Sequence, residues 1–176
     1  FNPAAASAAT TLGSLPSSAA SGGCSASPGC DFFQLADPFG SYTVPTAGVI
    51  TAFNIREGTV FTGTNTAKLR VYRPIGGGSW TVVGESQPTA MLPFGNYYDT
   101  MPARITVQPG DRLGLSLVVQ GDSPWQHPGD PTEGIGTINL SVPVGGSFSP
   151  GDISGFGTTK LSLKARLEPD ADGDGY

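Results

Sequence analysis

Stretches in which apolar and polar residues alternate recur along this chain, and glycine or proline interrupts them. Such a two-residue period gives a β-strand one apolar and one polar face, and no window of the chain carries a helical period. The residues expected to face inward in three stretches are Val49, Thr51, Phe53 and Ile55; Ile138, Leu140, Val142 and Val144; and Leu161, Leu163, Ala165 and Leu167. The chain is therefore predicted to be all-β, an antiparallel β-sandwich of about eight strands, with jelly-roll connectivity as one way of joining them.

The composition supports one folded domain and argues against two kinds of partner. With 176 residues, 38% of them hydrophobic, the chain is long enough to bury a core. Its net charge is −5 and its nine basic residues are scattered, whereas nucleic-acid binding needs clustered Lys and Arg. No apolar run is long enough to span a bilayer, so neither nucleic acid nor a membrane span is expected.

The chain divides into three parts by composition. Residues 1–30 form an uncharged N-terminal segment rich in Ala, Ser and Thr, because the first charged residue is Asp31. Residues 31–168 carry the alternating pattern and are predicted to form the sandwich domain. Residues 169–176 begin an acidic tail.

Two cysteines, Cys24 and Cys30, flank a Ser-Pro-Gly turn in "CSASPGC". Such a loop closes into a disulfide when the two Cα atoms lie within about 7 Å, and two free thiols in a reducing compartment are the alternative. We predict the disulfide, because both cysteines lie in a polar, turn-rich stretch. A disulfide implies export, and residues 1–30 lack the pattern of a signal peptide, so we expect a mature secreted form, extracellular or at the cell surface.

An enzyme is the least supported function. His127 lies near Asp130 and Glu133, but three prolines surround it and no second histidine exists to complete a metal site. No Gly-x-Ser-x-Gly motif occurs, and no pair of acidic residues suggests a glycosidase. The chain is predicted not to be an enzyme.

Two stretches, 87–102 and 121–136, lack the alternation and are predicted to be loops at the ends of the sandwich. They carry Tyr97, Tyr98 and Trp125, whose rings are candidates for stacking on sugars. The alternative is that these rings pack inward as anchors. This pattern supports the second function considered, a secreted carbohydrate-binding or adhesion module.

Aspartates alternate in the C-terminal run "EPDADGDGY". Calcium loops place side-chain oxygens at alternate positions, then a glycine, then a backbone carbonyl. Here the side-chain ligands are Asp170, Asp172 and Asp174, and Tyr176 supplies the carbonyl; a solvated acidic tail is the alternative. We predict a partial calcium site, whose other oxygens come from downstream residues, another chain or water.

The motifs "YTVPTAGVITAFNIREG", "AKLRVYRP", "WTVVGES", "MPARITVQPGDRLGL" and "LKARLEPDADGDGY" resemble a group of secreted actinobacterial proteins. Those proteins carry a β-sandwich followed by an acidic tail similar to thrombospondin type 3 calcium repeats. The resemblance covers about residues 41–176, and its most specific part is "ARLEPDADGDGY". It implies an extracellular location and a calcium-binding tail, and it implies no reaction.

The charge-poor surface and the open edges of a sandwich favour self-assembly. We expect the segment "AAASAATTLGSL" to lie in a groove or on a sheet edge, with a neighbouring subunit as its partner. The residues expected to make this contact are Ala6, Ala8, Thr10, Leu12 and Leu15. The function predicted first is therefore a non-enzymatic extracellular structural protein, a homo-oligomer or a subunit of a surface filament.

Overall fold

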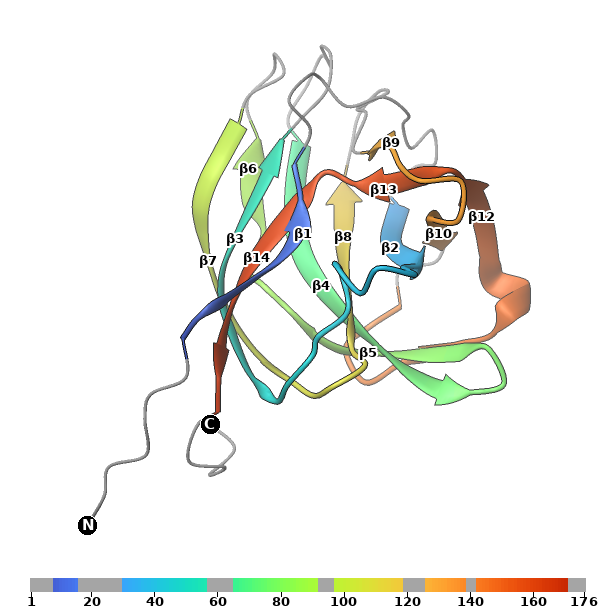
Figure 1. Ribbon diagram of the computed structural model, residues 1–176, viewed down its shortest axis with the longest axis horizontal. Helices are drawn as coiled ribbons and strands as arrows, with labels where there is room; N and C mark the ends of the chain where they lie inside the picture. The colour runs from blue at the N-terminus through green and yellow to red at the C-terminus, as the bar shows by residue number, and fades with distance from the viewer. Residues whose placement is uncertain are drawn as a thin grey trace.

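The computed structural model describes residues 8–15, 30–56, 65–91, 97–118, 126–138 and 142–170. Within these residues it confirms the all-β prediction, because antiparallel strands form two large sheets in a sandwich-like arrangement (Figure 1). The described strands number fourteen, not about eight, because several short strands extend the edges of the sheets or pair outside them. The only helical element in this part of the chain is a short 3-10 turn, η1 (Pro150–Asp152).

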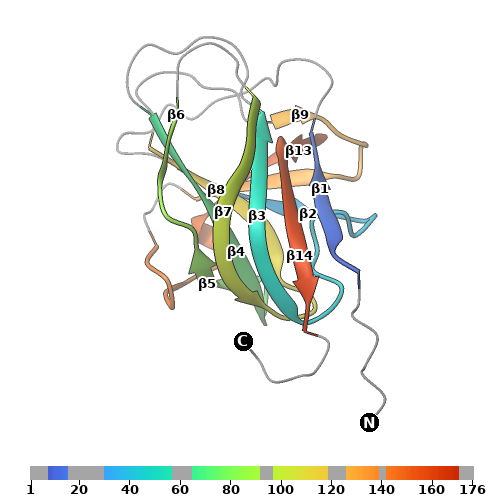
Figure 2. The ribbon, with the colours of Figure 1, turned by 90° about the vertical axis from the view of Figure 1, so that its left-hand side faces the viewer.

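The first sheet has four strands in the order β1-β14-β3-β7, and its outer face is turned toward the viewer in Figure 2. This sheet brings the two ends of the described chain side by side, because β1 pairs with β14. The bounds are β1 (Thr10–Ser14), β3 (Gly48–Arg56), β7 (Tyr97–Val107) and β14 (Leu163–Pro169).

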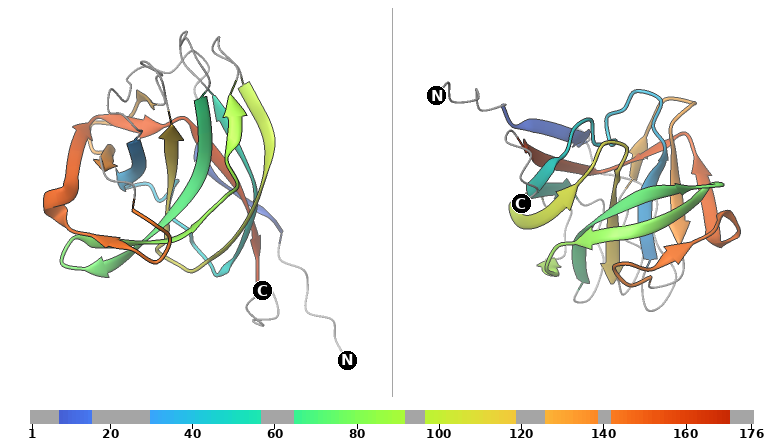
Figure 3. Two further views of the ribbon diagram at one scale, coloured as in Figure 1. Left: turned by 180° about the vertical axis from the view of Figure 1, so that it is seen from behind. Right: turned by 90° about the horizontal axis from the view of Figure 1, so that it is seen from below.

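The second sheet has eight strands, seven of them in the order β11-β5-β4-β8-β2-β10-β12, with β6 paired to β4. The chain crosses between the two sheets from β2 to β3 to β4 and again from β5 through β7 to β8, a kind of connection found in Greek-key and jelly-roll sandwiches (Figure 3). A third sheet pairs β13 with β9. The bounds are β2 (Cys30–Ala36), β4 (Asn65–Gly76), β5 (Ser79–Glu85), β6 (Thr89–Met91), β8 (Arg112–Val118), β9 (Gln126–Pro128), β10 (Gly134–Ile138), β11 (Ser147–Phe148), β12 (Ile153–Gly157) and β13 (Thr159–Leu161).

Two clusters of buried side chains hold the sandwich together. The larger one fills the space between the sheets and includes Phe53 and Ile55 of β3, Leu69 of β4 and Leu115 of β8. The smaller one covers the other face of the eight-stranded sheet. Its members are Phe33, Tyr72, Trp80, Val82, Ile138, Val142 and Phe148. Burial on both faces explains why β4 is buried without a break from Leu69 to Tyr72 although its sequence alternates.

The expected inward faces are confirmed in β14 and corrected in two other places. Leu163, Ala165 and Leu167 are buried as predicted. In β3 a bulge between Ile50 and Ala52 shifts the register, so Ile50 enters the core and Thr51 does not.

The third expected face is confirmed in part, and both predicted loops are partly wrong. Ile138 and Val142 are buried as predicted, Leu140 lies outside the described residues, and Val144 lies in a turn with half of its surface exposed. The stretch 87–102 is not one loop, because β6 and the first part of β7 fall within it, and the stretch 121–136 contains β9 and the start of β10. Pairing with β3 overrides the weak local pattern in the first of these stretches.

Among the described residues, no helix has the length and apolar character needed to cross a membrane.

Candidate functional site

The N-terminal strand β1 lies at the edge of the four-stranded sheet, where Figure 2 shows it beside β14. It pairs antiparallel with β14 from Thr10 opposite Leu167 to Ser14 opposite Leu163. Ala8, Thr10 and Thr11 are exposed, whereas Leu12 is buried in the main core. The segment expected to bind a sheet edge therefore does so on its own chain, and Ala6 lies outside the described residues.

A short loop closes the other side of β1, so the strand sits in a slot. The amide of Gly13 donates a hydrogen bond of 2.5 Å to the carbonyl oxygen of Ser41. The next residue, Tyr42, is fully buried against the end of β1. We call the space between β14 and residues 41–42 the β1 slot.

Gly13 fits the slot because it has no side chain. Its φ of +79° lies in the left-handed region, which favours glycine. A Cβ at this position would lie 2.2 Å from the carbonyl oxygen of Leu163 and 3.2 Å from the ring of Tyr42. The nearest obstacle is backbone, which cannot rotate away, so the slot requires glycine here.

Tyr42 clamps β1 through its hydroxyl group. The hydroxyl donates a hydrogen bond of 2.5 Å to the carbonyl oxygen of Leu161. Since its one proton is used there, the hydroxyl of Ser14, 2.8 Å away, acts as the donor to Tyr42. Burial raises the pKa of Tyr42 well above its ordinary value, so the phenol stays neutral and keeps its proton for Leu161.

The loop that carries Tyr42 is itself fixed by Asp37. Its carboxylate accepts hydrogen bonds from the amides of Ser41 at 3.0 Å and Tyr42 at 2.8 Å. It also accepts a 2.7 Å bond from the hydroxyl of Thr43. None of these three bonds involves β1, so the position of Tyr42 is fixed by contacts outside that strand.

Replacing Tyr42 with phenylalanine is expected to loosen β1 while leaving the rest of the sandwich folded. The ring volume stays, but the Leu161 carbonyl and the Ser14 hydroxyl lose a buried partner, which costs about 1 to 3 kcal/mol. Hydrogen exchange should become faster at the amides of β1 and β14 and stay unchanged in β4 and β8. Unchanged exchange in β1 would show that the clamp does not hold the strand.

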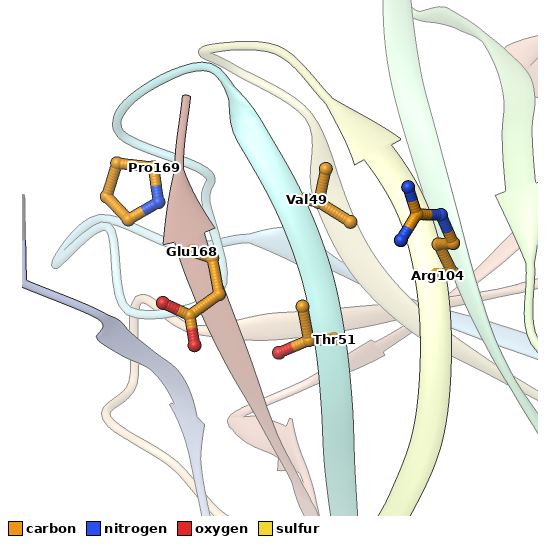
Figure 4. A pocket seen from close by; sticks show the side chains of 5 residues that line it. All are labelled: Val49, Thr51, Arg104, Glu168 and Pro169. Carbon is orange, nitrogen blue, oxygen red and sulfur yellow. The ribbon is translucent and has the colours of Figure 1, made fainter. Parts of the chain in front are cut away.

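A hollow of about 270 Å³ lies on the outer face of the same sheet, as Figure 4 shows. Three adjacent strands line it: Val49 and Thr51 come from β3, Arg104 from β7, and Glu168 and Pro169 from β14. The guanidinium of Arg104 and the carboxylate of Glu168 lie on opposite sides of Thr51 (Figure 4). The hollow thus presents both signs of charge around a small apolar floor.

A buried group of charges lies on the far side of the eight-stranded sheet. Arg70 contacts the carboxylate of Asp31, bonds to Glu85 at 2.9 Å and donates to the Val142 carbonyl at 2.6 Å. Burial raises the pKa of Asp31, and a Ser116 hydrogen bond and the Arg70 charge offset part of this rise. The group joins β2, β4, β5 and the segment at Val142, so its evident role is structural.

Of the residues named in the calcium prediction, one, Asp170, lies among the described residues. The amide of Asp170 donates a 3.1 Å hydrogen bond to the carbonyl of Ala47, which places it beside the start of β3. Asp172, Asp174 and Tyr176 lie outside the described residues. Within the described ranges no group of three or more His, Cys, Asp or Glu residues could hold a metal ion, so the partial site stays a prediction.

The aromatic and cysteine predictions also fall mostly outside the described part of the chain. Tyr97 and Tyr98 belong to the first residues of β7, and Trp125 is not described. Cys30 begins β2 and is buried, while Cys24 is not described. The sugar-binding rings and the disulfide therefore stay predictions.

The histidine cluster considered for catalysis has its carboxylates occupied by turn contacts. Glu133 accepts a 2.6 Å bond from the amide of Asp130 and lies 3.6 Å from Lys160. Asp130 accepts two bonds from Thr132, which hold its pKa below the ordinary value. Both carboxylates thus stabilise the turn before β10.

The sequence reading missed the residues that build the slot. Tyr42 is 28 residues from Ser14 and 119 from Leu161 along the chain. A contact at such a separation leaves no local pattern. The one available signal was the glycine between two leucines in "TTLGSL", because glycine within a strand marks a close approach of another backbone segment.

Comparisons with family models, with curated proteins and with solved structures found no match for this chain.

Proposed function

We propose that this chain is a non-enzymatic extracellular structural protein that assembles into a filament by strand exchange. In this proposal, β1 of one subunit occupies the β1 slot of its neighbour instead of its own. The observation that carries the proposal is the slot itself: a groove shaped for glycine that holds the edge strand β1, and whose Tyr42 is fixed by contacts outside that strand.

Exchange of β1 between copies preserves every contact of the slot. The backbone pairs with β14, Leu12 in the core and the Ser14–Tyr42 bond are the same whether the strand belongs to the same chain or to another. Exchange of an identical element is therefore a route to assembly that needs little new interaction energy. Each subunit gives one strand and accepts one, and such a head-to-tail contact extends into a filament when it does not close.

The chain between β1 and β2 is long enough for exchange. Residues 15–29 connect the two strands. Because the proposed disulfide holds Cys24 close to Cys30, residues 15–23 set the reach, which is at most about 32 Å at full extension. Many of these residues are Ser, Ala and Gly, which give a connecting segment little tendency to fold by itself. A neighbouring slot is therefore within reach.

Export, the Cys24–Cys30 disulfide and calcium binding at the acidic tail complete the proposal. The disulfide would keep the start of β2 fixed while β1 moves. It is tested by alkylation of the unfolded protein without reductant, which should leave both cysteines unmodified in mass spectrometry. Calcium binding is tested by titration calorimetry, where Asp172→Asn should abolish the heat of binding.

Electron microscopy and sedimentation velocity of the full chain test the assembly. We expect filaments or large oligomers that are lost in Leu12→Asp, because a buried unpaired charge prevents docking of β1. Thr11→Asn is the control, since Thr11 is the exposed neighbour of Leu12 and an uncharged polar residue there should retain the assemblies. A monomer at every concentration, with and without calcium, would contradict the proposed function.

A further inference from the structure

Basic residues gather on the outer face of the four-stranded sheet although the chain as a whole is acidic. Four of the nine Lys and Arg residues lie on its strands: Arg56 on β3, Arg104 on β7, and Lys164 and Arg166 on β14. Successive side chains of a strand point to opposite faces, and each of the four adjoins a core residue, namely Ile55, Ile105, Leu163 or Leu167. We call this surface the cationic face.

The other five basic residues form ion pairs or hydrogen bonds with groups of their own chain. Lys68 pairs with Glu85, Arg70 with Asp31 and Glu85, Arg73 with Asp111, Lys160 with Glu133, and Arg112 donates to the carbonyls of Gln34 and Leu35. On the cationic face, by contrast, neither Arg104 nor Lys164 forms an ion pair with a described residue. Arg166 pairs with Glu168 at 2.7 Å but stays 62% exposed. The charges of Arg104 and Lys164 are therefore the ones that this surface offers to a partner.

The acidic tail has the spacing that suits this surface. Its aspartates occupy alternate positions 170, 172 and 174, and Lys164 and Arg166 are also two residues apart on β14. Two residues of extended chain span about 6.6 to 6.8 Å, so carboxylates of an extended tail would meet basic groups at the same interval. The described acids of the eight-stranded sheet, Asp31 and Glu85, are already paired with Arg70.

We propose that the cationic face binds the acidic tail, residues 170–174, of a second copy of this chain. The inference rests on the proposed function in that assembled subunits bring one copy's tail near another copy's sheet. The hollow between Arg104 and Glu168 is the place where the two charged surfaces meet, because Arg104 forms no ion pair there with a side chain that the structure describes. Attraction between exposed charges gives specificity and association rate, and it weakens with salt.

Charge reversal in full-length chains tests the inference, with a chelator present so that calcium does not neutralise the aspartates. One variant reverses the face, Arg104→Glu with Lys164→Glu, and the other reverses the tail, Asp172→Lys with Asp174→Lys. We expect each variant alone to associate with an affinity at least about tenfold lower than that of the unmodified chain. Circular dichroism should show that both variants remain folded. An equimolar mixture should recover association, because the acidic tail of the first meets the basic face of the second.

A matched control changes the charge elsewhere. The variant Asp130→Lys with Asp152→Lys alters the net charge as much as the tail variant does, at two exposed positions away from the cationic face. It should associate like the unmodified chain. Association that does not respond to either charge reversal would overturn the inference. A mixture of the two variants that fails to recover association would overturn it as well, and this is the result expected if each tail docks on its own chain.

The outcomes separate this inference from the proposed function. Strand exchange depends on Leu12 and Gly13 and not on these charges. If both reversals leave filaments intact, the tail contact is wrong and the proposed function stands. If the mixture complements but Leu12→Asp has no effect on assembly, the tail contact stands and strand exchange is wrong.

Discussion

Replacing Gly13 with alanine is expected to expel β1 from its slot and abolish assembly. The new methyl group would lie 2.2 Å from the Leu163 carbonyl oxygen, and the backbone would be held at a φ of +79° that alanine rarely adopts. The left-handed conformation costs about 1 to 2 kcal/mol and the overpacking about 1 to 3 kcal/mol. The sum, about 2 to 5 kcal/mol, is large for a strand of five residues held at one edge.

Gly145→Ala is the matched control for Gly13→Ala. Gly145 has a φ of +84°, close to that of Gly13, but no atom lies within 4 Å of the position that a Cβ would take. This variant should lose only the free energy of unfolding that the left-handed backbone costs, about 1 to 2 kcal/mol in denaturant unfolding. It should keep its assemblies. If Gly13→Ala behaves like Gly145→Ala in unfolding, hydrogen exchange and sedimentation, then the close fit of the slot does not matter.

Replacing Arg70 with methionine should cost about 3 to 5 kcal/mol of unfolding free energy, since it leaves the carboxylate of Asp31 buried without its partner. Lys68→Met is the control, because its ion pair with Glu85 is partly exposed and such pairs contribute about 0 to 1 kcal/mol. A double variant that adds Asp31→Asn should recover part of the loss, because no buried charge remains. A loss below about 1 kcal/mol for Arg70→Met would contradict the structural role of this group.

The pH dependence of the Arg70→Met loss follows from the neighbouring acids. The folded-state pKa of Asp31 lies above its unfolded value, so its contribution to stability falls as the pH rises through the folded pKa. Removing Arg70 raises that pKa further. Burial raises the pKa of Glu85, but hydrogen bonds from Lys68 and Arg70 outweigh this effect and lower it, so Glu85 loses its stabilising contribution as the pH falls. Both effects make the deficit of Arg70→Met largest at neutral pH and smaller toward about pH 4.

The alternating pattern predicted the fold class and the buried face of β14, because one residue period determines both. It did not predict the bulge in β3, which places Ile50 in the core instead of Thr51. The position of a bulge depends on the strand that pairs with β3, and the sequence of β3 alone does not show it. The alternating pattern also does not reveal the burial of Arg70 and Tyr72, which alternate with the core residues Leu69 and Val71 on β4. Both are buried, because a segment from much later in the chain, at Val142, covers them.

The candidate site was predictable only in outline. The sequence indicated that the segment containing Leu12 binds a sheet edge, and the structure places it on the edge of β14. The partners Ser41 and Tyr42 come from a loop whose own pattern is unremarkable, so contact with β1 appears only in three dimensions. Docking of β1 on a neighbouring copy stays a prediction.

Cross-linking between two singly substituted chains tests the strand exchange most directly. Thr11 and Arg166 lie directly opposite each other on the outer face, so cysteines at these positions are placed for a disulfide. Chains with Thr11→Cys and chains with Arg166→Cys are co-expressed, oxidised and separated without reductant, with each variant alone and the unmodified chain as controls. Strand exchange predicts a covalent heterodimer that appears only in the co-expressed sample. Its absence, together with an internally closed monomer when one chain carries both cysteines, would show that β1 stays in its own slot.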